Sequence, residues 1–216
     1  MPRQLTFDLG ARPARGRGDF FVSEANAAAV AMIDAPERWP DGRLLLTGPE
    51  GAGKTHLAHV WAAGSDARFV TAEDDPATLA TAAVIEDADR WPRAEEERLF
   101  HLLNLARERK LPLLLTARTP PADWAIALPD LQSRLAALTL IRIEPPDDAL
   151  LMAVVTKLFA DRQIMPPPSL IHWLLPRIER SFAAAERMVA RIDAAALAEG
   201  RAPTRSLARR VLEQES

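Results

Sequence analysis

The sequence contains no cysteine, which excludes disulfide bonds and metal sites built from thiolates. Its four histidines (His56, His59, His101 and His172) are scattered and show no metal-ligand spacing. No uninterrupted apolar run approaches the roughly 18 residues of a membrane-spanning helix, and the first residues lack the apolar core of a signal peptide. A formal net charge of −3 argues against the general positive field of a non-specific nucleic-acid binder. We therefore expect a cytoplasmic protein with no membrane partner.

The 216 residues suffice for a domain of about 130 residues together with a smaller one. Short apolar runs alternate with helical patterns, and these runs predict strands at 43–48, 67–70, 82–87, 111–118 and 138–145. The runs are continuously apolar rather than alternating, which is typical of a parallel sheet covered by helices on both faces.

Helical patterns occupy the intervals between these strands and the whole C-terminal third of the chain. Ser23 is the expected N-cap of the first helix. Further helices are predicted at 56–64, 93–110, 128–138, 147–162, 168–178, 181–199 and 204–214. We predict an α/β fold, with a five-stranded parallel sheet flanked by helices and a small all-helical C-terminal domain. The expected divisions are a tail at 1–18, a nucleotide-binding domain at 19–145 and a helical lid at 146–216.

The segment "GPEGAGKT" (48–55) matches the phosphate-binding loop pattern G-x-x-x-x-G-K-[ST] and lies between a predicted strand and a predicted helix. Glycines let the backbone turn its N–H groups toward phosphate oxygens, and the following helix adds its positive end. A chance glycine-rich turn is the alternative, but it would rarely satisfy every position of the pattern. The expected ligand is ADP or ATP with Mg²⁺, held by Gly48, Pro49, Glu50, Gly51, Ala52, Gly53, Lys54, Thr55 and His56.

An acidic pair, Glu86 and Asp87, ends the apolar run "AAVIED". Two acids at a strand end are common, but about 30 residues after a phosphate-binding loop they match the carboxylates that hold Mg²⁺ and polarise water in nucleotide hydrolysis. Thr55 and Glu86 are therefore the expected metal ligands, and Glu86 and Asp87 are catalytic candidates.

Arg134 lies on a short amphipathic helix, "LPDLQSRLAAL", just before the last predicted strand. A surface ion pair is one interpretation of this residue. The other is an arginine finger, which places a planar cation against the γ-phosphate in a neighbouring subunit.

The first residues contain "QLTFDLG" (4–10), in which Leu5, Phe7 and Leu9 share one face of an extended backbone. A linker rich in Gly, Pro and Arg follows at 11–19. A first β-strand would explain the alternation, but the five strands of the sheet are already accounted for. A docking peptide for a hydrophobic groove is the favoured hypothesis.

The order of these features resembles the AAA+ ATPases, and "GKTHLAHV" and "LPDLQSRL" resemble their DnaA-related branch over roughly residues 19–200. About 17 residues follow the predicted lid helix at 181–199, so we expect no DNA-reading domain of the kind that ends the initiator DnaA. Such a short module opening on a Gln-Leu-x-apolar-x-Leu peptide resembles the members of this branch that inactivate DnaA at the sliding clamp.

The resemblance implies two protein partners, the sliding clamp (the β subunit of DNA polymerase III) and DnaA, and it leaves a homo-oligomer possible. It assigns Gln4, Leu5, Phe7 and Leu9 to clamp binding, Arg134 to a finger acting on DnaA-bound ATP, Phe21 and Val22 to the adenine, and Arg191 to nucleotide sensing from the lid. Glu86 and Arg118 depart from the initiator's pattern. For that reason we expect little ATPase activity from this chain alone.

Two other functions share parts of this evidence. A DnaA-like helicase loader would bind single-stranded DNA and a replicative helicase, but it leaves the N-terminal peptide unexplained. A metabolic P-loop kinase would explain the phosphate-binding loop but not Arg134 or the helical lid.

Overall fold

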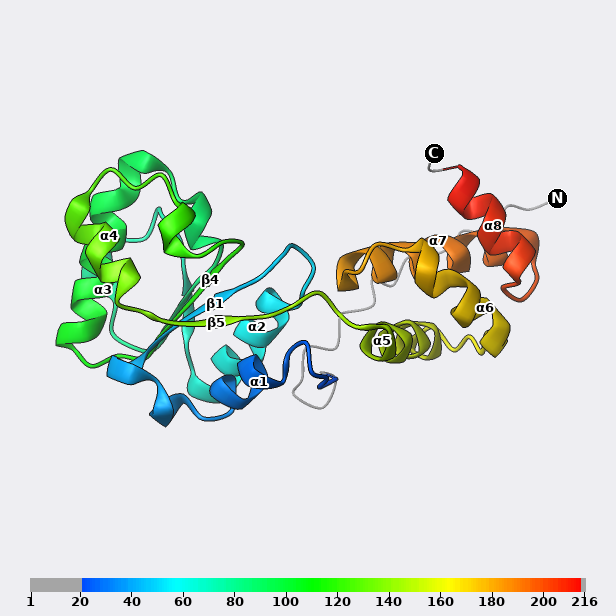
Figure 1. The fold of residues 1–216 in the computed structure, drawn as a ribbon, viewed down its shortest axis with the longest axis horizontal. Coiled ribbons are helices and arrows are strands. Elements are labelled where there is room, and N and C mark those ends of the chain that lie inside the picture. Colours follow the sequence, from blue (N-terminus) through cyan, green and yellow to red (C-terminus); the bar gives the residue numbers. More distant parts are fainter. Residues whose placement is uncertain (1–20, 215–216) are drawn as a thin grey trace.

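The computed structural model describes residues 21–214, and these build a five-stranded, all-parallel sheet (Figure 1). The strands are β1 (Arg43–Thr47), β2 (Arg68–Val70), β3 (Ala83–Ile85), β4 (Leu113–Ala117) and β5 (Thr139–Arg142), in the order β2-β3-β4-β1-β5. In β1, Leu45 pairs with Leu115 of β4 on one side and with Leu140 of the edge strand β5 on the other. The predicted α/β class and parallel sheet are confirmed. The carboxyl ends of β1, β3 and β4 therefore lie along one edge.

Side chains that alternate along the strands enter two separate cores, one on each face of the sheet. Leu45 and Leu115 pack with α3 (Glu96–Glu108) and α4 (Pro129–Ala136). On the other face, the core includes Leu44, Leu46 and Leu114, which pack with α1 (Ala27–Ile33) and α2 (Lys54–Ser65). The helix that follows the phosphate-binding loop and the helix that carries Arg134 thus cover opposite faces.

The start of α1 differs from the prediction. Asn26, not Ser23, is the N-cap, and its Oδ1 accepts a hydrogen bond of 2.9 Å from the Ser23 N–H. The Ser23 carbonyl oxygen accepts from the Ala27 N–H at 2.9 Å. The chain therefore makes one extra turn before the helix, so the expected cap at Ser23 is wrong.

The C-terminal part contains only helices: α5 (Asp148–Asp161), α6 (Pro168–Leu174) with a short 3-10 turn after it, α7 (Phe182–Glu199) and α8 (Arg205–Glu213). Their N-caps include Asp147, Ser181 and Thr204, whose side chains each accept a backbone N–H, as sequence patterns for helix starts require. These helices share a core of their own that includes Phe159 and Ile192. Figure 1 shows them gathered apart from the sheet, on the side of α1 and α2.

Within the described part of the chain, no helix is both long enough and apolar enough to span a membrane.

Candidate functional site

The backbone of the phosphate-binding loop leaves the end of β1 in a shape that needs glycine. At Gly48, φ is 153°, and a Cβ atom would lie 2.4 Å from the Ile143 carbonyl oxygen. Such a contact leaves no space for any side chain, because real Cβ atoms do not approach backbone oxygens so closely. The loop between β1 and α2 is therefore drawn against the segment that follows β5.

The start of α7 lies directly on this loop. The Phe182 N–H donates a hydrogen bond of 2.8 Å to the Gly51 carbonyl oxygen. A Cβ at Gly51, where φ is 73°, would lie 2.6 Å from the Ser181 Cβ. The helical part of the chain thus touches the loop through its Ser181–Ala183 turn, and this turn carries no cationic side chain.

Lys54 is the first residue of α2, and its side chain is buried under the loop. Its Nζ donates to the carbonyl oxygens of Gly48 at 2.7 Å and Pro49 at 2.9 Å. Burial lowers the pKa of Lys54, and the nearby carboxylates of Asp87 and Asp89 partly offset this effect. Thr55 is exposed in the same first turn, beside the partly buried His56.

The predicted acidic pair follows β3 directly, and the chain turns sharply there because Asp87 has a φ of 47°. The Asp87 N–H donates to the Thr116 hydroxyl of β4 at 3.1 Å. This turn brings in Asp89, which sequence analysis missed although a third acid is visible in "EDAD". Asp89 Oδ2 accepts from the Arg118 N–H at 3.1 Å. Three carboxylates thus lie at this edge of the sheet.

Two of these carboxylates keep an oxygen available for a ligand. Glu86 Oε1 and Asp89 Oδ1 are buried without a hydrogen-bond partner in the part of the chain that the structure describes. In residues 21–214, no group of three or more His, Cys, Asp and Glu side chains could hold a metal by itself. Mg²⁺ usually binds through one or two carboxylates together with waters and substrate phosphates, which fits this arrangement.

An ion pair that sequence analysis missed joins the tip of the phosphate-binding loop to the end of β4. The Arg118 guanidinium, just beyond the end of β4, lies 2.7 Å from Glu50 Oε2. Arg118 is also among the charges that lower the pKa of Lys54, although less than burial does. The sequence could show only that a basic residue stands at this strand end, because Glu50 and Arg118 are far apart along the chain.

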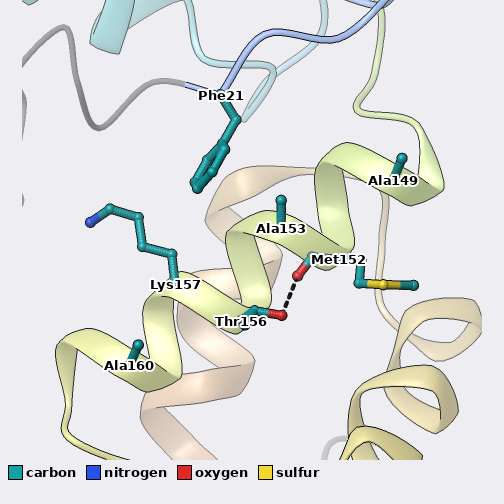
Figure 2. A pocket seen from close by; sticks show the side chains of 7 residues that line it. All are labelled: Phe21, Ala149, Met152, Ala153, Thr156, Lys157 and Ala160. Carbon is teal, nitrogen blue, oxygen red and sulfur yellow. Dashed lines mark hydrogen bonds between the residues drawn. The ribbon is translucent and has the colours of Figure 1, made fainter.

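Phe21 lies over α5 and closes one side of a largely apolar pocket of about 430 Å³ (Figure 2). The other residues that line it all belong to one face of α5: Ala149, Met152, Ala153, Thr156, Lys157 and Ala160. Small alanines form much of this face, so the Phe21 ring stands above an open space rather than a packed contact. Val22, the other residue predicted near the adenine, is exposed and does not line the pocket.

Arg191, the residue predicted to sense the nucleotide from the lid, lies on α7 and contacts α8. The Arg191 guanidinium donates to the Val211 carbonyl oxygen of α8 at 2.6 Å. Arg177 stacks on Trp173, with its Cζ 4.4 Å from the ring centroid, and Arg180 pairs with Asp148 at 2.7 Å. The α7 residues that meet the loop are Phe182 and Ala183. Nucleotide sensing by Arg191 stays a prediction.

Arg134 lies on α4, which Leu131 and Leu135 anchor in the core. Its side chain is partly buried, and among residues 21–214 it has no ion-pair partner. The surface ion pair considered as an alternative is therefore not formed within this range. The predicted clamp-binding residues, Gln4, Leu5, Phe7 and Leu9, lie outside the described residues.

No family model matches the chain. It is 24% identical over 197 residues to the chromosomal replication initiator protein DnaA of Cutibacterium acnes, covering 79% of this chain. The match spans only 39% of the length of that relative.

Two solved structures share the fold. Domain III of the Thermotoga maritima replication initiation protein DnaA has a TM-score of 0.80 at 16% identity, covering 94% of this chain and 97% of that one. A replication initiator DnaA bound to AMPPCP and single-stranded DNA has a TM-score of 0.70 at 17% identity, covering 84% and 65%. The chain therefore has a DnaA-related AAA+ fold, that of domain III of the replication initiator.

Proposed function

We propose that the chain is a nucleotide-binding AAA+ regulator of DNA replication initiation that acts on DnaA. The observation that carries the proposal is the convergence of three features at one edge of the sheet. The first is a loop whose backbone admits only glycine at position 48. The second is the buried Lys54, and the third is the pair of carboxylates, Glu86 and Asp89, that each have an oxygen without a hydrogen-bond partner among the described residues. Such a set suits the phosphates of a nucleotide and an accompanying Mg²⁺.

The proposed site for the adenine is the pocket between Phe21 and α5. An adenine ring is flat and largely apolar on its faces, and the pocket between Phe21 and α5 offers an aromatic ring above a floor of small alanines (Figure 2). An AMPPCP-bound DnaA shares this fold, which supports an adenine nucleotide, ADP or ATP, as the ligand.

Bound Mg²⁺ would neutralise phosphate charge, and Thr55 and Glu86 are the residues that would hold it. Asp87 and Asp89 lie at the same strand end and favour the charged form of Lys54. We infer that this chain uses its own nucleotide mainly to set its conformation. Its partner DnaA is where hydrolysis takes place.

The finer proposal is that the protein acts as Hda does, the DnaA-related protein that binds the DNA-loaded sliding clamp and makes DnaA hydrolyse its ATP. Residues 4–9 dock on the sliding clamp, and Arg134 reaches ATP bound to a DnaA molecule. The position of α4 supports an action in trans, because α4 and α2 pack on opposite faces of the sheet. Arg134 has no ion-pair partner within residues 21–214, so its guanidinium is available to a neighbouring molecule.

The experiment that tests this proposal measures hydrolysis of DnaA-bound ATP in the presence of clamp loaded on DNA. We expect the wild-type chain to stimulate hydrolysis and Arg134→Ala to lose that stimulation by about 10³-fold or more, the range known for arginine fingers. Arg107→Ala is the matched control, because Arg107 is an exposed arginine on α3, the neighbouring helix on the same sheet face. Equal stimulation by wild type and Arg134→Ala would contradict the finger assignment.

A second candidate is a helicase loader that binds single-stranded DNA. It is favoured by the one observation that a neighbour in fold was solved with single-stranded DNA. Binding of a replicative helicase without binding of the clamp would favour this candidate over the first.

A further inference from the structure

The outer edge of β5 is an open edge of the sheet. Among the described strands, β5 pairs with β1 alone. The Ile143 N–H donates to the Thr47 carbonyl oxygen of β1 at 2.7 Å, and the Thr47 hydroxyl donates to the Ile141 carbonyl oxygen at 3.4 Å. Since the backbone groups of successive residues in a strand point to opposite sides, Leu140 and Arg142 turn their N–H and C=O groups away from β1.

Within residues 21–214, nothing covers these outward groups. The N–H and C=O groups of Leu140 and Arg142 make no backbone hydrogen bond outside the sheet in this range. The Leu140 side chain is 41% exposed although it lies in a strand. It points to the face of α3 and α4, because the neighbouring Ile141 packs on the other face. Unpaired backbone groups beside an exposed apolar side chain are what a further strand would cover.

The chain that leads into α1 already reaches this edge at one position. Just past β5, the Glu144 N–H donates to the Ala25 carbonyl oxygen at 3.0 Å. Glu144 points outward like Leu140 and Arg142, because it is an even number of residues away from both. The positions that stay open are those of Leu140 and Arg142, and the segment before Ala25 starts beside them.

Residues 4–9 have the pattern and the reach to fill these positions. Their three apolar residues alternate with polar ones, which is typical of a strand with one buried face. Residues 10–20 separate them from Phe21, and an extended chain of that length spans up to about 35 Å. A flexible tether of this kind keeps the segment at about millimolar local concentration near β5.

We propose that residues 4–9 pair with the outer edge of β5 as an additional strand while no sliding clamp is bound, and leave it when the clamp binds. This inference rests on the clamp docking proposed above. The same apolar face of the peptide is covered by the Leu140 side of the edge in one state and by the groove of the clamp in the other. The edge therefore competes with the clamp and lowers the clamp affinity of the free chain. The exchange is possible because the edge offers only two outward residues, so the pairing is short.

The first test follows amide hydrogen exchange in the full chain by mass spectrometry. We expect the outward amides of Leu140 and Arg142 to exchange about tenfold more slowly in the wild type than in Phe7→Asp, whose charge would not stay on the apolar face. Thr6→Ala is the matched control, because it changes a polar position of the same peptide and should keep the protection. Saturating sliding clamp should raise both exchange rates of the wild type to those of Phe7→Asp, because it takes the peptide.

The second test measures the clamp affinity of the full chain by calorimetric titration. Leu140→Lys removes the apolar contact at the edge and should tighten clamp binding by about two- to fivefold, since a larger fraction of the molecules then has a free peptide. Leu197→Lys is the matched control, because Leu197 is an exposed leucine on α7, and it should bind as the wild type does. Thermal unfolding of each variant shows whether it is folded.

Three results would overturn the pairing while leaving clamp docking intact. Two of them are equal exchange in the wild type and Phe7→Asp, and equal clamp affinity of the wild type and Leu140→Lys. The third is protection that rises with protein concentration, because a second copy of the chain would then cover the edge. If neither the wild type nor Leu140→Lys binds the clamp, the proposed clamp docking fails, and slow exchange at β5 would still support the pairing.

Discussion

The ammonium group of Lys54 is held in an environment that opposes its own charge. It is buried, and burial lowers its pKa, while Asp87 and Asp89 restore only part of the stability of the charged form. Its hydrogen bonds go to the carbonyl oxygens of Gly48 and Pro49, which carry no formal charge. A phosphate in the loop would supply the missing counter-charge, so binding and protonation of Lys54 should favour each other.

This linkage predicts how nucleotide binding depends on pH. Affinity for AMPPCP should be full below the lowered pKa of Lys54 and should fall as pH rises through it, beginning at a pH below that at which an ordinary lysine titrates. Lys54→Arg is the control, because arginine stays protonated throughout. Calorimetry in buffers of different ionisation enthalpy should show proton uptake by the wild type at alkaline pH. A wild-type affinity as flat as that of Lys54→Arg would contradict the prediction.

Among the elements, the start of α4 is held in place by one buried carboxylate of α3, that of Glu96. Glu96 accepts hydrogen bonds from the N–H groups of Ala127 (3.0 and 2.9 Å, one to each oxygen) and Leu128 (2.8 Å), directly before α4 begins. Glu96→Ala would leave both donors without a partner, so we expect a loss of about 2–4 kcal/mol of unfolding free energy. Denaturant titration measures this loss. Glu97→Ala, an exposed neighbour in the same turn, should change stability by less than about 0.5 kcal/mol, and a similar effect of both variants would refute the role of Glu96.

The elements themselves were predictable because their apolar spacing repeats over many residues. The stripe of Leu99, Leu102, Leu103 and Ala106 is buried as α3 requires, and the continuously apolar strands form the expected parallel sheet. What the pattern could not show are contacts between residues distant in the chain. Glu96 with Ala127, and Glu50 with Arg118, each depend on how two elements meet.

The same limit applied to individual positions in the lid. Helical periodicity placed Arg191 on a helix, but it could not say which turn would touch the loop. The structure shows that the contact is made by the start of α7, through Ser181 and Phe182, before any of the α7 arginines. Likewise, the loop pattern identified Lys54, whereas Asp89 became part of the site only through the turn at Asp87.

At the scale of the whole molecule, the sheet separates the two proposed activities. The phosphate-binding loop and α2 lie on the side of the helical lid, and α3 and α4 lie on the other face (Figure 1). A molecule built in this way can hold its own nucleotide on one side and present Arg134 to a neighbouring molecule on the other. Delivery to that neighbour then requires a third contact, which the proposal assigns to residues 4–9.

Clamp binding should therefore depend on residues 4–9 and not on the nucleotide site. Gln4→Ala/Leu5→Ala/Phe7→Ala should abolish retention of the full chain on immobilised sliding clamp, because it removes two apolar anchors and the amide that would enter a groove. AMPPCP affinity should stay within about twofold, since the phosphate contacts are unchanged. Thr6→Ala/Asp8→Ala is the matched control, because it alters the alternate positions of the same peptide and should retain binding. Full retention of the triple variant would remove the peptide from the mechanism, and with it the gain in local concentration that a tether on the clamp would give.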